Sequence, residues 1–268
     1  MVTGETYGWN DEPWLDLFAV QEDNPMSEPI RLKGDINTKF HESSVAFSTD
    51  YKNDTIMYFT RNNFNDKKEG YGASNEINLK IYSAKFVDGE WVENSNLRMN
   101  SDYYSTGHPS VNQARTRIYF ASDRPGGYGG TDIYYAEIHE RGGIQTPINA
   151  GPIVNTEGNE MFPFINEEGK LFFSSDGHVG FGQLDVFSTI SNEDGVVIDI
   201  INLGTPINSS SDDFAYYGLP NGLDGYVSSN REGGVGSDDI YKFKFTPALD
   251  VEGYVVDGVN KQMLHSVT

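Results

Sequence analysis

The sequence predicts an all-β fold, a β-propeller of four-stranded blades. Its composition is the first reason: the chain has 29 Gly, 16 Tyr and 16 Phe among 268 residues, which is typical of short strands joined by glycine-rich turns. The second reason is that the sequence repeats itself about every 53 residues. Serial units of this length, each with several short strands, are typical of propeller blades.

The repeat is visible in three clear copies, residues 108–138, 161–190 and 214–245, in a looser copy at 44–86 and in a partial copy that ends at Val20. The position that opens the last strand of each copy is occupied by Asp16, Lys80, Asp132, Asp185 and Asp239. These positions lie 64, 52, 53 and 54 residues apart.

A second series lies between the copies and keeps the same period. Its members are Asn37, Asn100, Asn155 and Asn208, at steps of 63, 55 and 53 residues. Two independent series with one period make coincidence a poor explanation, so we expect the four asparagines to occupy equivalent positions in successive blades.

Within a copy, the alternation of short apolar runs and turns predicts the strands. For the copy at 161–190 we expect strands at 162–165, 171–174 and 186–189, and the segments around Ile153 and Ile207 are expected to supply outer strands. We assign residues 1–248 to the propeller and predict five blades, with six as the alternative. The first copy lacks its inner strands, and we expect upstream sequence to supply them, since an open strand edge invites aggregation.

Asp132, Asp185 and Asp239 stand beside the glycine-rich turns and are interpreted as structural. An Asp there can accept hydrogen bonds from the backbone of its own turn, or pair with Arg124 and Arg231. The alternative is a ring of carboxylates for catalysis or cation binding. A second catalytic alternative is the segment Trp9–Pro13, because glycosidases work with carboxylates brought together in one site.

The net charge of −21 disfavours nucleic acid and anionic lipid as partners. The chain has no Cys, and its five His have no metal-ligand spacing. The acidic pairs do not match a Ca²⁺ loop either. We therefore predict no cofactor, and weakly held Ca²⁺ stays an open alternative.

The loops that break the repeat are the candidate partner-binding sites, because loops that differ between blades carry the function of such scaffolds. They cover residues 5–14, 62–74 and 102–106. The aromatic residues in or beside them are Trp9, Trp14, Tyr71, Tyr103 and Tyr104; packing between blades is the alternative role for each.

The repeats resemble a known family. Residues 122–136 (SDRPGGYGGTDIYYA), 175–189 and 229–243 are similar to the WD40-like β-propeller repeat, in which Ser-Asp-Arg precedes Gly-Gly and Asp-Ile-Tyr. This repeat is common in envelope proteins with an OmpA-like domain, such as the PorE-like peptidoglycan-associated lipoproteins of the type IX secretion system. Lys80 and Thr60-Arg61 depart from the pattern.

Residues 249–268 are interpreted as the start of a carboxypeptidase-regulatory-like β-sandwich or as a closing strand. The resemblance implies a periplasmic protein associated with the outer membrane. Its partners would be envelope proteins, a peptide or glycan, and peptidoglycan through a domain outside this chain.

No catalytic constellation stands out from the repeat. We therefore expect a non-catalytic interaction scaffold, not an enzyme. The alternatives are a glycosidase-like five-bladed enzyme and a glycan- or peptide-binding propeller.

Overall fold

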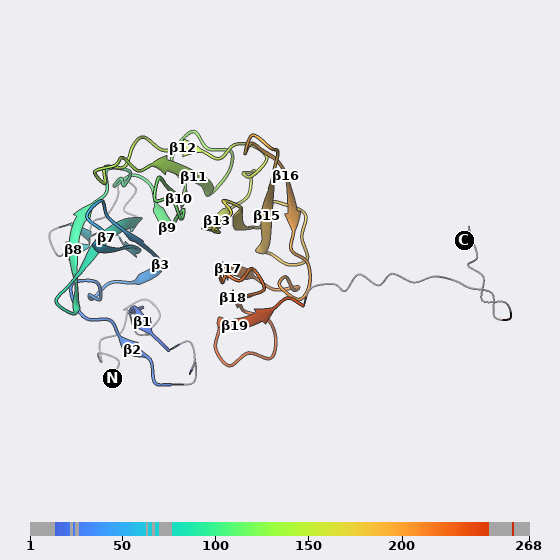
Figure 1. Ribbon diagram of the computed structural model, residues 1–268, viewed down its shortest axis with the longest axis horizontal. Helices are drawn as coiled ribbons and strands as arrows, with labels where there is room; N and C mark the ends of the chain where they lie inside the picture. Colours follow the sequence, from blue (N-terminus) through green and yellow to red (C-terminus); the bar gives the residue numbers. More distant parts are fainter. Residues whose placement is uncertain are drawn as a thin grey trace.

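The computed structural model describes residues 14–21, 24, 27–62, 64–65, 68–69, 77–246 and 259. All regular elements in these ranges are β-strands, gathered into small sheets that stand around a common centre (Figure 1). The all-β propeller predicted from the repeat is confirmed. No helix of the described chain is long and apolar enough to cross a membrane.

Three blades have four antiparallel strands each. The first comprises β3 (Glu42–Thr49), β4 (Thr55–Asn62), β7 (Leu79–Val87) and β8 (Glu90–Asn96). The second comprises β9 (Thr106–Val111), β10 (Arg117–Ser122), β11 (Asp132–Glu137) and β12 (Ile148–Asn149). The third comprises β13 (Glu160–Ile165), β14 (Leu171–Ser175), β15 (Asp185–Ser191) and β16 (Val197–Asn202).

The last blade has three described strands: β17 (Asp213–Gly218), β18 (Asp224–Ser229) and β19 (Asp239–Lys244). A two-stranded sheet of β1 (Phe18–Ala19) and β2 (Ile30–Arg31) lies between the first and last of these blades (Figure 1). A further hairpin, β5 (Phe64–Asn65) and β6 (Lys68–Glu69), extends from the end of β4. Five sheets thus surround the centre, in agreement with the predicted five-bladed plan.

The outer strands lie earlier in the chain than the sequence predicted. β12 and β16 end six residues before Asn155 and Asn208, whereas Ile207 lies beyond its strand and is buried. Val154 and Ile207, the apolar residues before these asparagines, are buried in the hydrophobic clusters between blades. Their apolar character comes from this burial and not from a strand.

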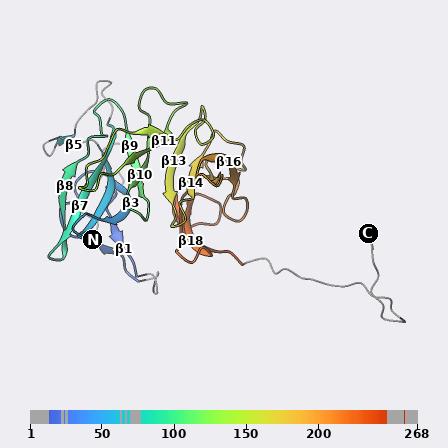
Figure 2. The ribbon, with the colours of Figure 1, turned by 45° about the horizontal axis from the view of Figure 1, so that its top comes forward.

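The hydrophobic core is divided into clusters, each of which lies between two neighbouring blades. Phe120 and Ile118 of β10, for example, pack with Ile56 and Tyr58 of β4. Phe173 of β14 packs with Ile133 of β11. Each interface buries apolar surface that a single blade would expose, so the blades stabilise one another. Figure 2 shows the blades side by side from a second direction.

The innermost strands β9, β13 and β17 run in the same direction. The Phe162 amide donates to His108 Nδ1 (3.3 Å) and the Ile165 amide to Ser110 Oγ (3.1 Å). The starts of β9 and β13 therefore lie together, as do their ends. The ring pairs Phe162–Phe214 and Phe164–Tyr216 show the same for β13 and β17. The first residues of these strands therefore lie at one end of the propeller, together with the glycine-rich turns.

Candidate functional site

The innermost strands share an irregularity near their first residues. The strand register shifts in each of them, and one residue per strand has a positive φ: Ser44, His108, Phe162 and Ala215, at 40° to 55°. Such bulges re-aim side chains and occur often beside active sites. A left-handed residue with a large side chain is also strained. We define the axial site as these four residues with the strand openings beside them.

His108 and Phe162 are the most distinctive pair in the axial site. Their rings stack with centroids 3.9 Å apart and an interplanar angle of 11°, and Phe162 also contacts Phe214 at 5.0 Å. His108 Nδ1 accepts the Phe162 amide, so the ring nitrogen Nε2 carries the proton of the neutral imidazole. Burial lowers the pKa of His108 to about 4, which keeps the ring neutral at pH 7.

Three of the innermost strands open with a buried carboxylate. Glu42, Glu160 and Asp213 each stand two residues before the left-handed residue and are fully buried. The second blade has the uncharged Thr106 at the first position of β9. Carboxylates from three blades therefore lie at one end of the propeller.

Each of these carboxylates is held by the turn that precedes it. Glu160 accepts the amide and hydroxyl of Thr156 at 2.8 and 2.6 Å, and the hydroxyl of Ser175 at 2.7 Å. Asp213 accepts the amide and hydroxyl of Ser209 and is paired with Arg231. The two groups thus differ in environment, because one has only neutral donors among these bonds and the other a guanidinium.

Glu42 lies beside the buried guanidinium of Arg61, at 2.8 Å. Arg61 also reaches Glu93 at 2.7 Å and lies over the rings of Phe59 and Tyr82. Burial raises the pKa of Glu42, an effect that Thr38 and Arg61 partly offset. The departure Thr60-Arg61 from the repeat thus provides the first blade with a buried ion pair in place of the serine hydroxyl used in the third.

Sequence reasoning missed these carboxylates, although a signal was present. Three of the four anchor asparagines are followed by Thr or Ser and then, four residues after that, by Glu or Asp, as in Asn155-Thr156 with Glu160. The same spacing occurs after Asn37 and Asn208.

Asp132, Asp185 and Asp239 bind the backbone of their own glycine-rich turns. They accept amides of Tyr128 and Gly129, of Phe181 and Gly182, and of Val235 and Gly236. Glycine is required beside them, because a Cβ at Gly127, Gly180 or Gly234 would collide with the carboxylate. Arg124 and Arg231 bond elsewhere, to Met99 O and to Asp213 respectively.

The candidate partner-binding aromatics are spread over the surface. Tyr103 is 77% exposed, while Tyr104 is half-buried beneath the guanidinium of Arg124 at 5.0 Å. Trp14 packs on His41 and Phe40, at 4.8 and 6.1 Å between ring centroids. Trp9 and Tyr71 lie outside the described residues, as does the segment Trp9–Pro13.

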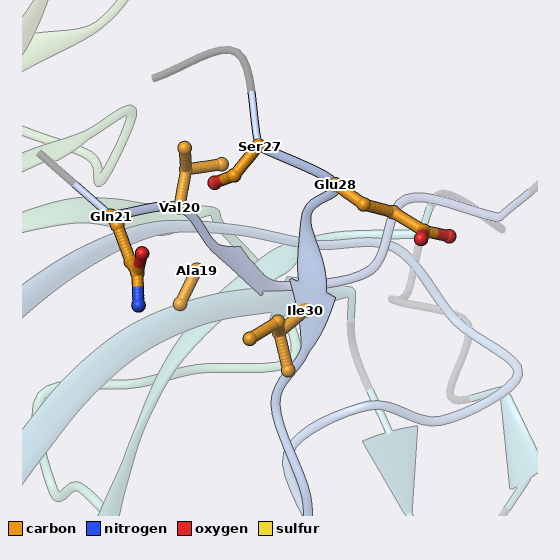
Figure 3. A pocket seen from close by; sticks show the side chains of 6 residues that line it. All are labelled: Ala19, Val20, Gln21, Ser27, Glu28 and Ile30. Carbon is orange, nitrogen blue, oxygen red and sulfur yellow. The ribbon is translucent and has the colours of Figure 1, made fainter. Parts of the chain in front are cut away.

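A shallow pocket of about 220 Å³ lies beside the β1–β2 sheet, and its lining includes none of Glu42, Glu160 and Asp213. Figure 3 shows its lining: Ala19, Val20, Gln21, Ser27, Glu28 and Ile30. The lining has one carboxylate, Glu28, and one hydroxyl, Ser27, but no imidazole or second carboxylate to act with them. Among the described residues, no cluster of three or more His, Asp or Glu is placed to hold a metal ion.

Comparison with protein-family models gives no match, and comparison with curated proteins gives none either. Solved structures do match. An α-L-arabinofuranosidase from Lactobacillus brevis aligns with a TM-score of 0.52 at 13% identity, over 83% of this chain and 79% of its own. A thermostable family-43 glycoside hydrolase aligns at 0.45 and 15% identity, over 81% and 78%.

A putative TolB from Agrobacterium tumefaciens aligns with a TM-score of 0.40 at 13% identity, over 72% of this chain and 71% of its own. At such identities the likeness to the arabinofuranosidase establishes the fold. The chain is therefore a β-propeller of the kind that the WD40-like repeats indicated.

The prediction of a non-catalytic scaffold, and with it the prediction that the chain is not an enzyme, is wrong. The α-L-arabinofuranosidase that shares the fold over most of the chain is an enzyme, so this propeller fold gives no ground for expecting a scaffold. The scaffold prediction rested on the lack of a catalytic motif apart from the repeat. That criterion fails here, because Glu42, Glu160 and Asp213 are repeat positions and still bring three carboxylates to one end.

Proposed function

We propose that this chain is a carbohydrate-active, glycosidase-like propeller whose sugar binds at the axial site. The observation that carries the proposal is the set of buried carboxylates that open β3, β13 and β17, each two residues before a strained left-handed residue. The α-L-arabinofuranosidase with the same fold supports it and suggests arabinofuranosides as the first substrates to test.

Glycoside hydrolysis needs one carboxyl as acid and another as base or nucleophile, in unlike environments. We assign the base or nucleophile to Asp213, because Arg231 stabilises its negative charge. We assign the acid to Glu160, because it accepts hydrogen bonds from Thr156 and Ser175, which are neutral donors. Since both side chains are buried, access for a sugar requires the turns at 156–159 and 209–212 to open.

The aromatic rings of the axial site give this end a face for the sugar. His108 stacks on Phe162, and Phe162 contacts Phe214 at an interplanar angle of 36°. Ligand sites combine such aromatic walls with few polar groups. The neutral His108 adds one N–H donor at Nε2.

We place this activity in the bacterial envelope. The proposal rests on the resemblance of residues 122–136 to repeats of OmpA-linked, PorE-like proteins of the type IX secretion system. Peptidoglycan and other envelope glycans then become the natural partners, together with envelope proteins. Immunodetection in periplasmic and outer-membrane fractions tests the location, and recovery with the cytoplasmic fraction alone would contradict it.

The activity is tested with the whole chain against aryl glycosides, α-L-arabinofuranosides among them, and against purified polysaccharides and peptidoglycan. Glu160→Gln and Asp213→Asn keep the side-chain shape and are each expected to lower kcat/KM by about 10²-fold or more. Glu168→Gln, an exposed carboxylate on the β13–β14 turn, is the matched control and should leave turnover unchanged.

Melting curves of all variants separate lost chemistry from lost folding. The proposal is overturned if the folded wild-type protein neither binds nor hydrolyses any substrate in the panel. It is also overturned if Glu160→Gln and Asp213→Asn retain full activity.

A further inference from the structure

The last described blade lacks the cover that the other blades have. β7, β11 and β15 each pair with a fourth strand, whereas β19 is the final strand of its sheet within the described residues. The second residue of β19 shows the consequence. Ile240 is 76% exposed, while its counterparts Ile81, Ile133 and Val186 are fully buried.

Those counterparts are capped by the anchor asparagines. Asn155 Oδ1 accepts the Ile133 amide at 2.8 Å, and its Nδ2 donates to the Ile133 carbonyl at 3.0 Å. Asn208 makes the same two bonds to Val186, at 2.8 and 2.9 Å. Asn100 and Asn37 repeat them at Ile81 and Leu17. In the described part of the chain, no asparagine makes these bonds to Ile240.

The spacing between the capped residue and its asparagine is nearly constant. It is 20, 19, 22 and 22 residues for Leu17, Ile81, Ile133 and Val186. Twenty residues after Ile240 stands Asn260, which is also 52 residues after Asn208. This step continues the series of 63, 55 and 53 between the established anchors.

The residue before each anchor supports the same register. Ile36, Met99, Val154 and Ile207 precede the four asparagines and are all buried. Asn260 is preceded by Val259, an apolar residue of the same kind, which is 94% exposed. Val259 thus has the residue type that the other blades bury at this position, while the edge of β19 is open within the described residues.

We propose that residues 249–254 form the fourth strand of the last blade, antiparallel to β19, and that Asn260, six residues further on, caps Ile240. The register follows from the third blade, where Phe187 pairs with Asn202 and Ser188 with Ile201. Shifted to the last blade, it pairs Tyr241 with Tyr254 and Lys242 with Gly253. Val259 then occupies the position of Ile207, which packs on Tyr216 and Val227 of the next blade.

This occupant accounts for the apolar character of the segment. Residues 251–256 read V-E-G-Y-V-V, with β-branched and aromatic residues on both sides of one glycine. Covering the β19 edge also removes a row of unpaired backbone groups that would otherwise invite strand addition by another chain. A separate domain starting at residue 249, or a second copy of this chain on β19, are the competing occupants.

Disulfide trapping tests the register, because the chain has no native Cys. In the full chain, Lys242→Cys with Gly253→Cys places two thiols at directly paired positions, within the reach of a disulfide. Lys242→Cys with Gln262→Cys, beyond the proposed strand, is the control. We expect the first pair to oxidise at least tenfold faster than the control, as a monomer. Equal rates, or a dimer from the first pair, would overturn the proposal.

Amide hydrogen exchange gives the second measurement. The Ile240 amide should be protected to the level of Ile133 and Val186 in the wild-type chain, and Asn260→Ala should speed its exchange at least tenfold. Gln262→Ala serves as the control and should not alter it. An Ile240 amide that exchanges freely in the wild type, or that ignores Asn260→Ala, would show that the segment lies elsewhere, as a separate domain would.

Discussion

His108 combines several unusual features in one residue. It has φ 55°, stacks on Phe162 and accepts the Phe162 amide through Nδ1. Its own amide donates to Thr60 Oγ1 at 2.9 Å, so His108 links the strands β4, β9 and β13 of three successive blades. A protonated imidazole could not accept the Phe162 amide, and burial disfavours the charge further. The axial site is therefore built around a neutral histidine.

This predicts that the protein loses stability in mild acid through His108. The folded-state pKa of about 4 lies below the ordinary value of 6.5. The contribution is thus complete above about pH 6.5 and is lost as pH falls from there towards 4, by up to about 3 kcal/mol. Urea unfolding of the wild type and of His108→Asn, measured from pH 7.5 to 4, checks it.

Asn is the chosen replacement because it does not titrate and tolerates a left-handed backbone. The free energy of unfolding of His108→Asn should fall less steeply over this range than that of the wild type. Parallel curves for the two proteins would show that His108 does not contribute. The buried carboxylates titrate in both proteins, so their effect cancels in the comparison.

At the scale of the strand, the anchor asparagines join one blade to the next. Each bonds both backbone groups of one residue, which is Leu17, Ile81, Ile133 or Val186. The Nδ2 groups of Asn155 and Asn208 also donate to Oδ1 of Asn149 and Asn202, which holds the two anchors in place. A side chain that mimics a strand partner is needed there because the fourth strand has already ended. These bonds are buried, so losing them leaves polar groups without water.

We expect Asn208→Ala to lower the free energy of unfolding by about 2 kcal/mol, because the Val186 amide loses its partner and the Val186 carbonyl keeps only the Leu203 amide. Thermal or urea unfolding measures the loss. Gln113→Ala, an exposed change on the β9–β10 turn, is the control and should be neutral within about 0.5 kcal/mol. A loss below about 1 kcal/mol for Asn208→Ala would mean that water replaces these bonds.

The elements differ in how far the sequence predicted them. The strands of the third blade and the period of Asn155 and Asn208 followed from the residues, because alternation and repetition are local signals. The bulge could not be foreseen, since Ser44, His108, Phe162 and Ala215 share no residue type. Its position depends on how innermost strands pair around the axis, which is a long-range property. The positions of Glu42, Glu160 and Asp213 follow a regular spacing in the sequence. Their shared place at one end of the propeller is evident only from the fold.

At the scale of the whole molecule, the fold and the charge oppose each other. Packing between blades depends on apolar clusters that are small and separate, while the chain carries a net charge of −21. Several of the ion pairs join exposed groups, as Arg117 and Glu137 do, and contribute little each. Mutual repulsion among the surplus carboxylates therefore acts against the compact arrangement of the blades.

Added salt should consequently stabilise the protein. Between about 10 mM and 1 M NaCl the screening length falls from about 30 Å to about 3 Å, which weakens repulsion across the surface more than it weakens the buried pair of Arg61 and Glu42. We expect a gain of about 1 kcal/mol and a rise in Tm of about 2–4 °C. Melting curves in NaCl and KCl at pH 7.5 should agree, because screening depends on ionic strength alone.

CaCl2 at equal ionic strength distinguishes screening from a specifically bound cation, since specific Ca²⁺ binding would raise Tm already at submillimolar concentration. A Tm that stays constant or falls with NaCl would show that favourable surface pairs, rather than repulsion, dominate the electrostatics of this propeller.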